Sequence, residues 1–188
     1  PRHPLPDPQR IHIPNLTSLR IQRPFTPLHH VLPVLTMPSL QSVFLYDLDS
    51  GHFGAPTDPI FSATELHLFE SGLDGSETST MYAAFPNVTH LTVDSLSIEE
   101  GIATLPSLQM LTIRSLSRGT AFILADMLMT RADKRLPSLT LRLDKRGRNV
   151  VKAKQLWDLV AKHGNIVPGD ADESWPPGSD YDDPHDLV

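Results

Sequence analysis

The chain contains no cysteine among its 188 residues, so disulfides and thiolate metal sites are excluded. The absence fits a reducing compartment and predicts a cytoplasmic or nuclear protein. No run of apolar residues approaches the ~20 needed to cross a bilayer, and no apolar stretch follows a basic N-terminus as in a signal peptide. We therefore expect no membrane-spanning segment and no membrane partner.

Motifs of the common catalytic and nucleotide-binding sites are also absent. The chain has no G-x-S-x-G, no G-x-x-x-x-G-K-[ST] and no G-x-G-x-x-G, which excludes a nucleophile elbow, a P-loop and a dinucleotide fingerprint. The nine histidines are scattered, and the adjacent pair His29 and His30 has no partner at metal-ligand spacing. We expect no catalytic, cofactor-binding or metal-binding residues, and hence no enzyme.

Acidic residues are concentrated at the C-terminal end of the chain. Residues 169–188 hold seven of the 22 acids and no Lys or Arg, so the net charge of -6 belongs to this segment. Its composition cannot bury enough apolar surface to offset the entropy of ordering, which predicts an acidic disordered tail over 169–188. At the other end, four prolines in the first eight residues predict a Pro-rich linker over 1–10 and an excerpt of a longer protein.

A basic stretch precedes the acidic tail. Residues 131–154 contain nine Lys or Arg against Asp133 and Asp144, a balance that raises the question of nucleic-acid binding. Aromatic side chains that would stack on bases are lacking within the stretch. We interpret it as a solvated edge with the acidic tail as a candidate intramolecular counterpart, and we expect no nucleic-acid partner.

One short pattern recurs along the chain: an apolar residue, a Pro and then spaced aliphatic residues. The clearest copies are FPNVTHLTVDSL at 85–96 and LPSLQMLTIRSL at 105–116. The first strand aliphatics of all copies, separated by 24, 23, 25, 20 and 30 residues, are Leu19, Val43, Leu66, Leu91, Leu111 and Leu141. Such spacing indicates stacked units, because one unit cannot bury its apolar face alone.

Within each copy, aliphatic and polar residues alternate with the period of a half-buried strand. Connections of 20 to 30 residues suit parallel neighbours rather than hairpins. Residues 117–135 have a helical apolar face, whereas 26–36 and 97–105 are typical of single irregular turns. The sequence predicts an α/β fold with short parallel strands in a curved sheet backed by helices and turns.

The C-terminal end of the stack needs a cap. Residues 149–164 are predicted to form an amphipathic helix with Asn149 as N-cap and Gly164 as C-cap. The residues expected on its apolar side are Leu156, Trp157 and Val160. This divides the ordered part of the chain into a repeat region over 11–148 and a capping helix over 149–168.

The repeats resemble leucine-rich repeats up to the second strand aliphatic. The matching residues are Val88, Leu91 and Val93 in one copy and Leu108, Leu111 and Ile113 in the next. Leu96 and Leu116 stand near the corner where regular repeats carry an asparagine. With a P-x-L opening and irregular repeat lengths, residues 11–145 are similar to the C-terminal repeat region of fungal F-box proteins. The resemblance implies an irregular leucine-rich-repeat solenoid that recognises substrates of a ubiquitin ligase. The ligase adaptor would bind only through an F-box upstream of this chain.

Residues between the strand aliphatics are expected on the opposite, concave face, the usual binding surface of solenoids. The two rows that alternation places there are Arg20, Phe44, His67, Thr92, Thr112 and Arg142, and Gln22, Tyr46, Phe69, Asp94, Arg114 and Asp144. Exposed aromatic side chains beside arginine are typical interface anchors. The predicted protein-binding residues are Arg20, Phe44, Tyr46, His67, Phe69, Arg114 and Arg142.

The same aromatic residues admit a structural interpretation. A loop, or residues outside this chain, would make them part of a core by covering the N-terminal repeats. The protein would then be a structural repeat fragment with no dedicated ligand; a third alternative is the non-catalytic part of a larger enzyme. We expect a protein–protein interaction scaffold.

Overall fold

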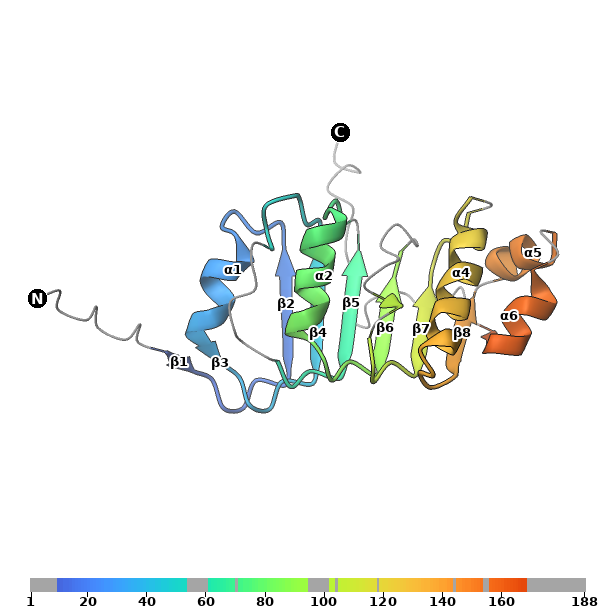
Figure 1. The fold of residues 1–188 in the computed structure, drawn as a ribbon. Helices are drawn as coiled ribbons and strands as arrows, with labels where there is room; N and C mark the ends of the chain where they lie inside the picture. Colours follow the sequence, from blue (N-terminus) through green and yellow to red (C-terminus); the bar gives the residue numbers. More distant parts are fainter. Residues whose placement is uncertain are drawn as a thin grey trace, which may run out of the picture.

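The structure is a computed structural model that describes residues 10–53, 61–69, 71–94, 102–103, 105–117, 119–143, 145–153 and 156–168. The predicted acidic tail, and the predicted linker apart from Arg10, lie outside the described residues, as do Leu96 and Asp144. The described part is a mixed α/β fold built on an open parallel sheet (Figure 1).

Seven strands form the main sheet, and every pair of neighbours in it is parallel. In spatial order they are β2 (Ser18–Gln22), β4 (Ser42–Tyr46), β5 (Glu65–Phe69), β6 (His90–Val93), β7 (Met110–Ile113), β8 (Leu139–Leu143) and β9 (Gly164–Pro168). Two-residue strands β1 (Ile11–His12) and β3 (Leu35–Thr36) form a separate parallel pair. The order follows the chain, so each connection leads to the adjacent strand.

The register aligns the marker aliphatics of successive copies. One row across the sheet consists of Leu19, Val43, Leu66, Leu91, Leu111, Leu141 and Ile166. Leu91 and Val93 of β6 pair with Leu111 and Ile113 of β7, and all four are at most 1% exposed. The predicted parallel arrangement with a shared aliphatic core is therefore confirmed.

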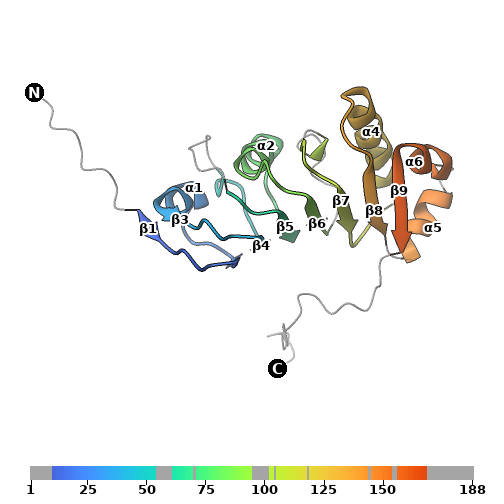
Figure 2. The same ribbon diagram turned by 90° about the horizontal axis from the view of Figure 1, so that it is seen from below.

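The described helices are α1 (Leu28–Val31), the 3-10 helix η1 (Leu32–Val34), α2 (Gly75–Ala84), α4 (Thr120–Asp133), α5 (Lys145–Ala153) and α6 (Trp157–His163). Most of them cover the face of the sheet that carries these aliphatic residues, whereas α5 lies at the end of the sheet, beyond β9 (Figure 2). Figure 2 shows α1, α2 and α4 on the same side of the sheet. The helix predicted within 117–135 is α4, and the irregular turn predicted over 26–36 is α1 with η1. Most of the turn predicted over 97–105 lies outside the described residues.

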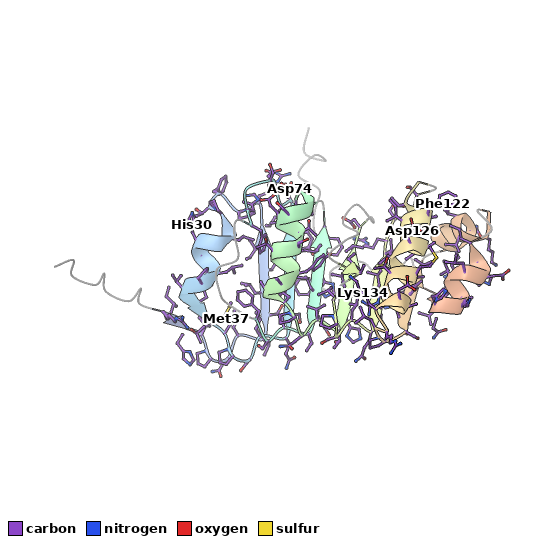
Figure 3. All side chains as sticks on the ribbon, in the orientation of Figure 1. His30, Met37, Asp74, Phe122, Asp126 and Lys134 are labelled. Carbon is purple, nitrogen blue, oxygen red and sulfur yellow. The ribbon has the colours of Figure 1, made fainter. Side chains whose placement is uncertain are left out.

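Helix α2 was not expected from the sequence, because its Ser- and Thr-rich residues show no apolar face. A capping box starts it: Asp74 accepts hydrogen bonds from the backbone N–H groups of Ser76 at 2.8 Å and Glu77 at 2.9 Å. Glu77 in return accepts from the backbone of Asp74 at 3.3 Å. Asp74 lies at the start of the helix (Figure 3). These bonds satisfy N–H groups that have no partner within the helix.

A buried arginine ties the end of α4 to the loop before β7. Arg131 is 2% exposed, and its guanidinium donates to the carbonyl oxygens of Leu105 at 2.9 Å and Leu108 at 3.0 Å. It also donates to the carbonyl oxygens of Ile102 and Pro137, at 3.3 and 3.4 Å. Hydrogen bonds from a charged donor are stronger than neutral ones and offset part of the cost of burying the charge.

The predicted capping helix over 149–164 is wrong in its extent. Two helices, α5 and α6, occupy the region, and Asn149 lies inside α5 rather than at its N-cap. Gly164 does end α6, but its backbone is extended and opens β9, which pairs with β8 and adds a seventh strand. Val160 is buried, and Leu156 and Trp157 pack against the core as predicted.

Residue 164 is glycine because β8 lies close to its Cα, and not because its backbone adopts the left-handed conformation of a helix C-cap. A Cβ there would lie 3.0 Å from the carbonyl oxygen of Leu139 and 3.4 Å from Cδ1 of Leu141. We expect Gly164→Ala to lower the free energy of unfolding by ~1–3 kcal/mol, because β9 must shift away from β8. Urea denaturation measures this. Gly75→Ala, with nothing within 4 Å of its added Cβ, is the matched control and should change stability little; equal effects would contradict the account.

The aliphatic row is expected to carry much of the stability. Leu111→Ala removes a side chain that is 0% exposed and should cost ~2–5 kcal/mol, because the rigid sheet and helices cannot close the cavity. Thermal or urea denaturation gives the value. Gln109→Ala, an exposed position on the same chain segment, should leave stability nearly unchanged. A loss below ~1 kcal/mol for Leu111→Ala would mean that the row is not a tight core.

Candidate functional site

Strand alternation gives the sheet a second face, which we call the aromatic face. Its central row pairs Arg20, Phe44, His67, Thr92, Thr112 and Arg142 in register. A second row begins with the paired residues Gln22, Tyr46 and Phe69, while Asp94 and Arg114 directly follow β6 and β7. Both rows match the predicted ones as far as the described residues extend.

Four rings lie together on β4 and β5. Phe44 and His67 stack with ring centroids 4.4 Å apart and planes 7° from parallel. Tyr46 and Phe69 stack at 5.0 Å and 23°, and His67 lies 6.5 Å from Phe69 at 10°. Each stacked pair consists of directly paired residues of adjacent parallel strands, so the ladder spacing of the sheet sets the ring separation.

Two arginines flank the rings. The Arg20 guanidinium carbon lies 4.7 Å above the Tyr46 ring, and that of Arg114 lies 5.5 Å from the Phe69 ring. Such cation–π contacts contribute ~0.5–1 kcal/mol each at exposed sites. Arg114 also lies 3.8 Å from the carboxylate of Asp94. The result is a cluster in which six of the seven predicted residues meet: Arg20, Phe44, Tyr46, His67, Phe69 and Arg114.

Arg142 lies apart from this cluster. Arg142 on β8 is paired with Thr112 on β7. Three strand spacings separate Arg142 from His67 on β5, a distance of roughly 14 Å at the usual spacing. Thr92 and Thr112 separate it from the rings. The face therefore has an aromatic part over β4 and β5 and a polar part that ends at Arg142.

Two of the predicted aromatic-face residues are less exposed than alternation suggests. Phe69 is 3% exposed and His67 is 8% exposed, whereas Phe44 and Tyr46 are half-buried. Phe69 is nevertheless not part of the hydrophobic core cluster, which contains its neighbours Leu66 and Leu68. The expectation that all three aromatics are exposed is thus wrong for Phe69, because stacking and cation contacts cover its ring faces.

Burial changes the acid–base behaviour of His67. Burial, and after it the charge of His90, lowers the pKa of His67 from 6.5 to about 4. A carboxylate oxygen of Glu65 lies 4.0 Å from Nε2 and favours protonation, but Glu65 is exposed, so solvent screens its charge. The imidazole is therefore neutral at neutral pH and stacks as an uncharged ring.

Sequence reasoning missed a third row on this face. It pairs Ser18, Ser42, Glu65, His90, Met110, Thr140 and Asn165, one alternation step before the central row. Glu65 and His90 are the members that act on His67. The same period-two pattern would have found them, had each strand been extended by one residue before its first aliphatic.

An ion pair lies beside Tyr46, where strands β2 and β4 end. Arg23 follows β2 and Asp47 follows β4, and the Nε of Arg23 donates to a carboxylate oxygen of Asp47. Both residues have positive φ, 43° and 52°, so the chain turns sharply where these strands end. Sequence reasoning did not single out either residue.

Within the described ranges, no group of three or more His, Asp or Glu side chains is placed to hold a metal ion. The helices of those same ranges are all too short or too polar to span a bilayer. Comparison of the chain with protein-family models, with curated proteins and with solved structures gave no match.

The lowered pKa of His67 makes stability depend on pH. Because the unfolded chain takes up the proton near pH 6.5 and the folded chain only near pH 4, the free energy of unfolding should fall by about 2 kcal/mol from pH 7.5 to pH 5. His67→Phe should remove this part of the decline in urea denaturation at the two pH values. His12→Asn, at an exposed position, is the control. Equal pH dependence in wild type and His67→Phe would refute the assignment.

Proposed function

We propose that this chain is an irregular leucine-rich-repeat solenoid that binds a protein partner through the aromatic face. The observation that carries the proposal is the ladder of stacked rings on β4 and β5 with an arginine at either side. Aromatic residues and arginine are the residue types that contribute most to binding energy in protein interfaces.

The architecture supports this proposal. Each sequence copy contributes one strand, neighbours are parallel and in register, and the connecting helices pack on the opposite side of the sheet (Figures 1 and 2). In solenoids of this kind the face without connecting helices is the usual binding surface. The rows of the aromatic face extend across the sheet and offer a partner many side chains at regular spacing.

We further propose that the binding surface selects substrates for a ubiquitin ligase, as the resemblance to fungal F-box proteins implies. The ligase adaptor would be contacted through an F-box outside this chain, in the cytoplasm or nucleus. The proposal assigns no catalytic chemistry, metal or cofactor to the chain, and no nucleic-acid partner.

The low exposure of His67 and Phe69 favours a second candidate, a structural repeat fragment without a dedicated ligand. In that case the rings serve only to hold β4 and β5 together. The two candidates differ in what happens to folding when the more exposed members of the face are changed. Arg20 is exposed and Phe44 is half-buried, so both can be changed without opening the aliphatic core.

Arg20→Glu and Phe44→Ser, made separately, test partner binding. On the binding hypothesis Arg20→Glu keeps the melting temperature within ~3 °C of wild type, since exposed substitutions change stability little. Phe44→Ser loses a half-buried, stacked ring outside the aliphatic core, so it should melt somewhat lower but remain folded at the temperature of the binding assay. Each then loses most of the proteins that the wild type captures from its native cell extract, as quantified by mass spectrometry. Phe122→Ser is the matched control, because Phe122 is 50% exposed on α4, away from the aromatic face (Figure 3).

Two outcomes contradict the binding hypothesis. If both variants fold and keep every partner, the aromatic face is not the binding surface. If Phe44→Ser melts early while Arg20→Glu folds and retains binding, the rings are structural, and the search moves to Arg114, Arg142 and the basic stretch of 131–154.

A further inference from the structure

The aromatic face combines rings and guanidinium groups in a way that restricts its ligand. Arg20 and Arg114 lie over the rings at one part of the face, and Arg142 lies at the other. A ligand that complements both parts carries aromatic side chains for the ring ladder and carboxylates for the arginines. A second copy of the same face is a poor match, because it would bring arginine against arginine.

One segment of this chain has that composition. Residues 169–188 contain Trp175 and Tyr181 among seven acids, with no Lys or Arg. The preceding residue, Pro168, ends β9 at the edge of the sheet where the strand ends Tyr46 and Phe69 also lie, because all strands are parallel. The segment thus begins beside the face that its composition complements.

The length of the segment is sufficient. Five strand spacings separate β9 from β4, roughly 24 Å. Trp175 is the seventh residue after Pro168 and can extend up to ~25 Å from it, just far enough to reach the rings on β5 and β4. Asp180 to Asp186 follow Trp175 by five to eleven residues, so they can extend further, to Arg20. A short covalent link gives the segment an effective concentration on the order of mM at the face. Even if the separate segment bound with a dissociation constant of only ~100 μM, the bound state of the linked segment would outnumber the free state about ten to one.

We propose that the acidic segment 169–188 is an intramolecular ligand of the aromatic face and competes there with the protein partner. This inference rests on the proposed function only for the competition, not for the binding of the segment. The segment supplies aromatic side chains to the ring ladder and carboxylates to Arg20 and Arg142. A partner with the same composition displaces it, so the face accepts only partners that bind more tightly than the chain's own segment.

The test uses the full chain with Trp157→Phe, which leaves Trp175 as the sole tryptophan. Acrylamide quenching of Trp175 should be several-fold weaker than in a synthetic peptide of residues 169–188. Salt at about 0.5 M should restore part of the quenching, because it screens arginine–carboxylate attraction. Arg20→Ser and Arg142→Ser in the same background should also restore it. Lys134→Ser, at an exposed lysine after α4, is the matched control and should not (Figure 3).

The outcomes separate this inference from the proposed function. Quenching of Trp175 as strong as in the free peptide, or protection that depends on Lys134 rather than on Arg20 and Arg142, overturns the inference and leaves partner binding as a separate question. If the segment is the ligand, changing Asp180, Asp182 and Asp183 to Asn should increase partner capture by the full chain. If quenching shows that Trp175 is protected through Arg20 and Arg142, while Phe44→Ser loses no partner in the capture experiment, the intramolecular contact stands and the proposed function is refuted.

Discussion

Each strand of the main sheet places aliphatic side chains against its neighbours at the same height, and the rest of the molecule depends on this register. The row from Leu19 to Ile166 runs across all seven strands. A shift of one residue in any strand would turn its aliphatic residues to the opposite face and its polar residues into the core. The parallel order therefore follows from packing, and the helices cover the apolar face that the register creates.

The candidate site is a consequence of the same register. Because residues between the aliphatics are also aligned, like side chains of adjacent copies become direct neighbours, and the aromatic pairs of β4 and β5 stack without any specialised loop. Toward β6 and β7 the central row continues with Thr92 and Thr112, and the second row continues with Asp94 and Arg114, so the rings end there. Composition at two positions per strand thus decides where the face is aromatic and where it is polar.

Much of the architecture could be predicted because strand alternation and repeat spacing are local properties of the sequence. Helix α4, the parallel strands and the rows of the aromatic face follow from them. Other features are not visible in the hydrophobic periodicity: α2 starts at a local capping box and is held by burial of Met81 and Tyr82, and β9 pairs with β8, which lies 25 residues earlier in the sequence. Periodicity does not report such contacts, so a helix was expected where α6 ends and a strand begins.

The sequence by itself determined which residues lie on which face, because alternation with a period of two leaves one choice once the aliphatic side is buried. It also determined the parallel order, through connections too long for hairpins. Tertiary structure alone decided how exposed the aromatic face is and how its groups titrate. Phe69 and His67 are covered by side chains from other strands, and the pKa of His67 falls because of that burial. Exposure and pKa depend on neighbours brought close in space, which no local pattern encodes.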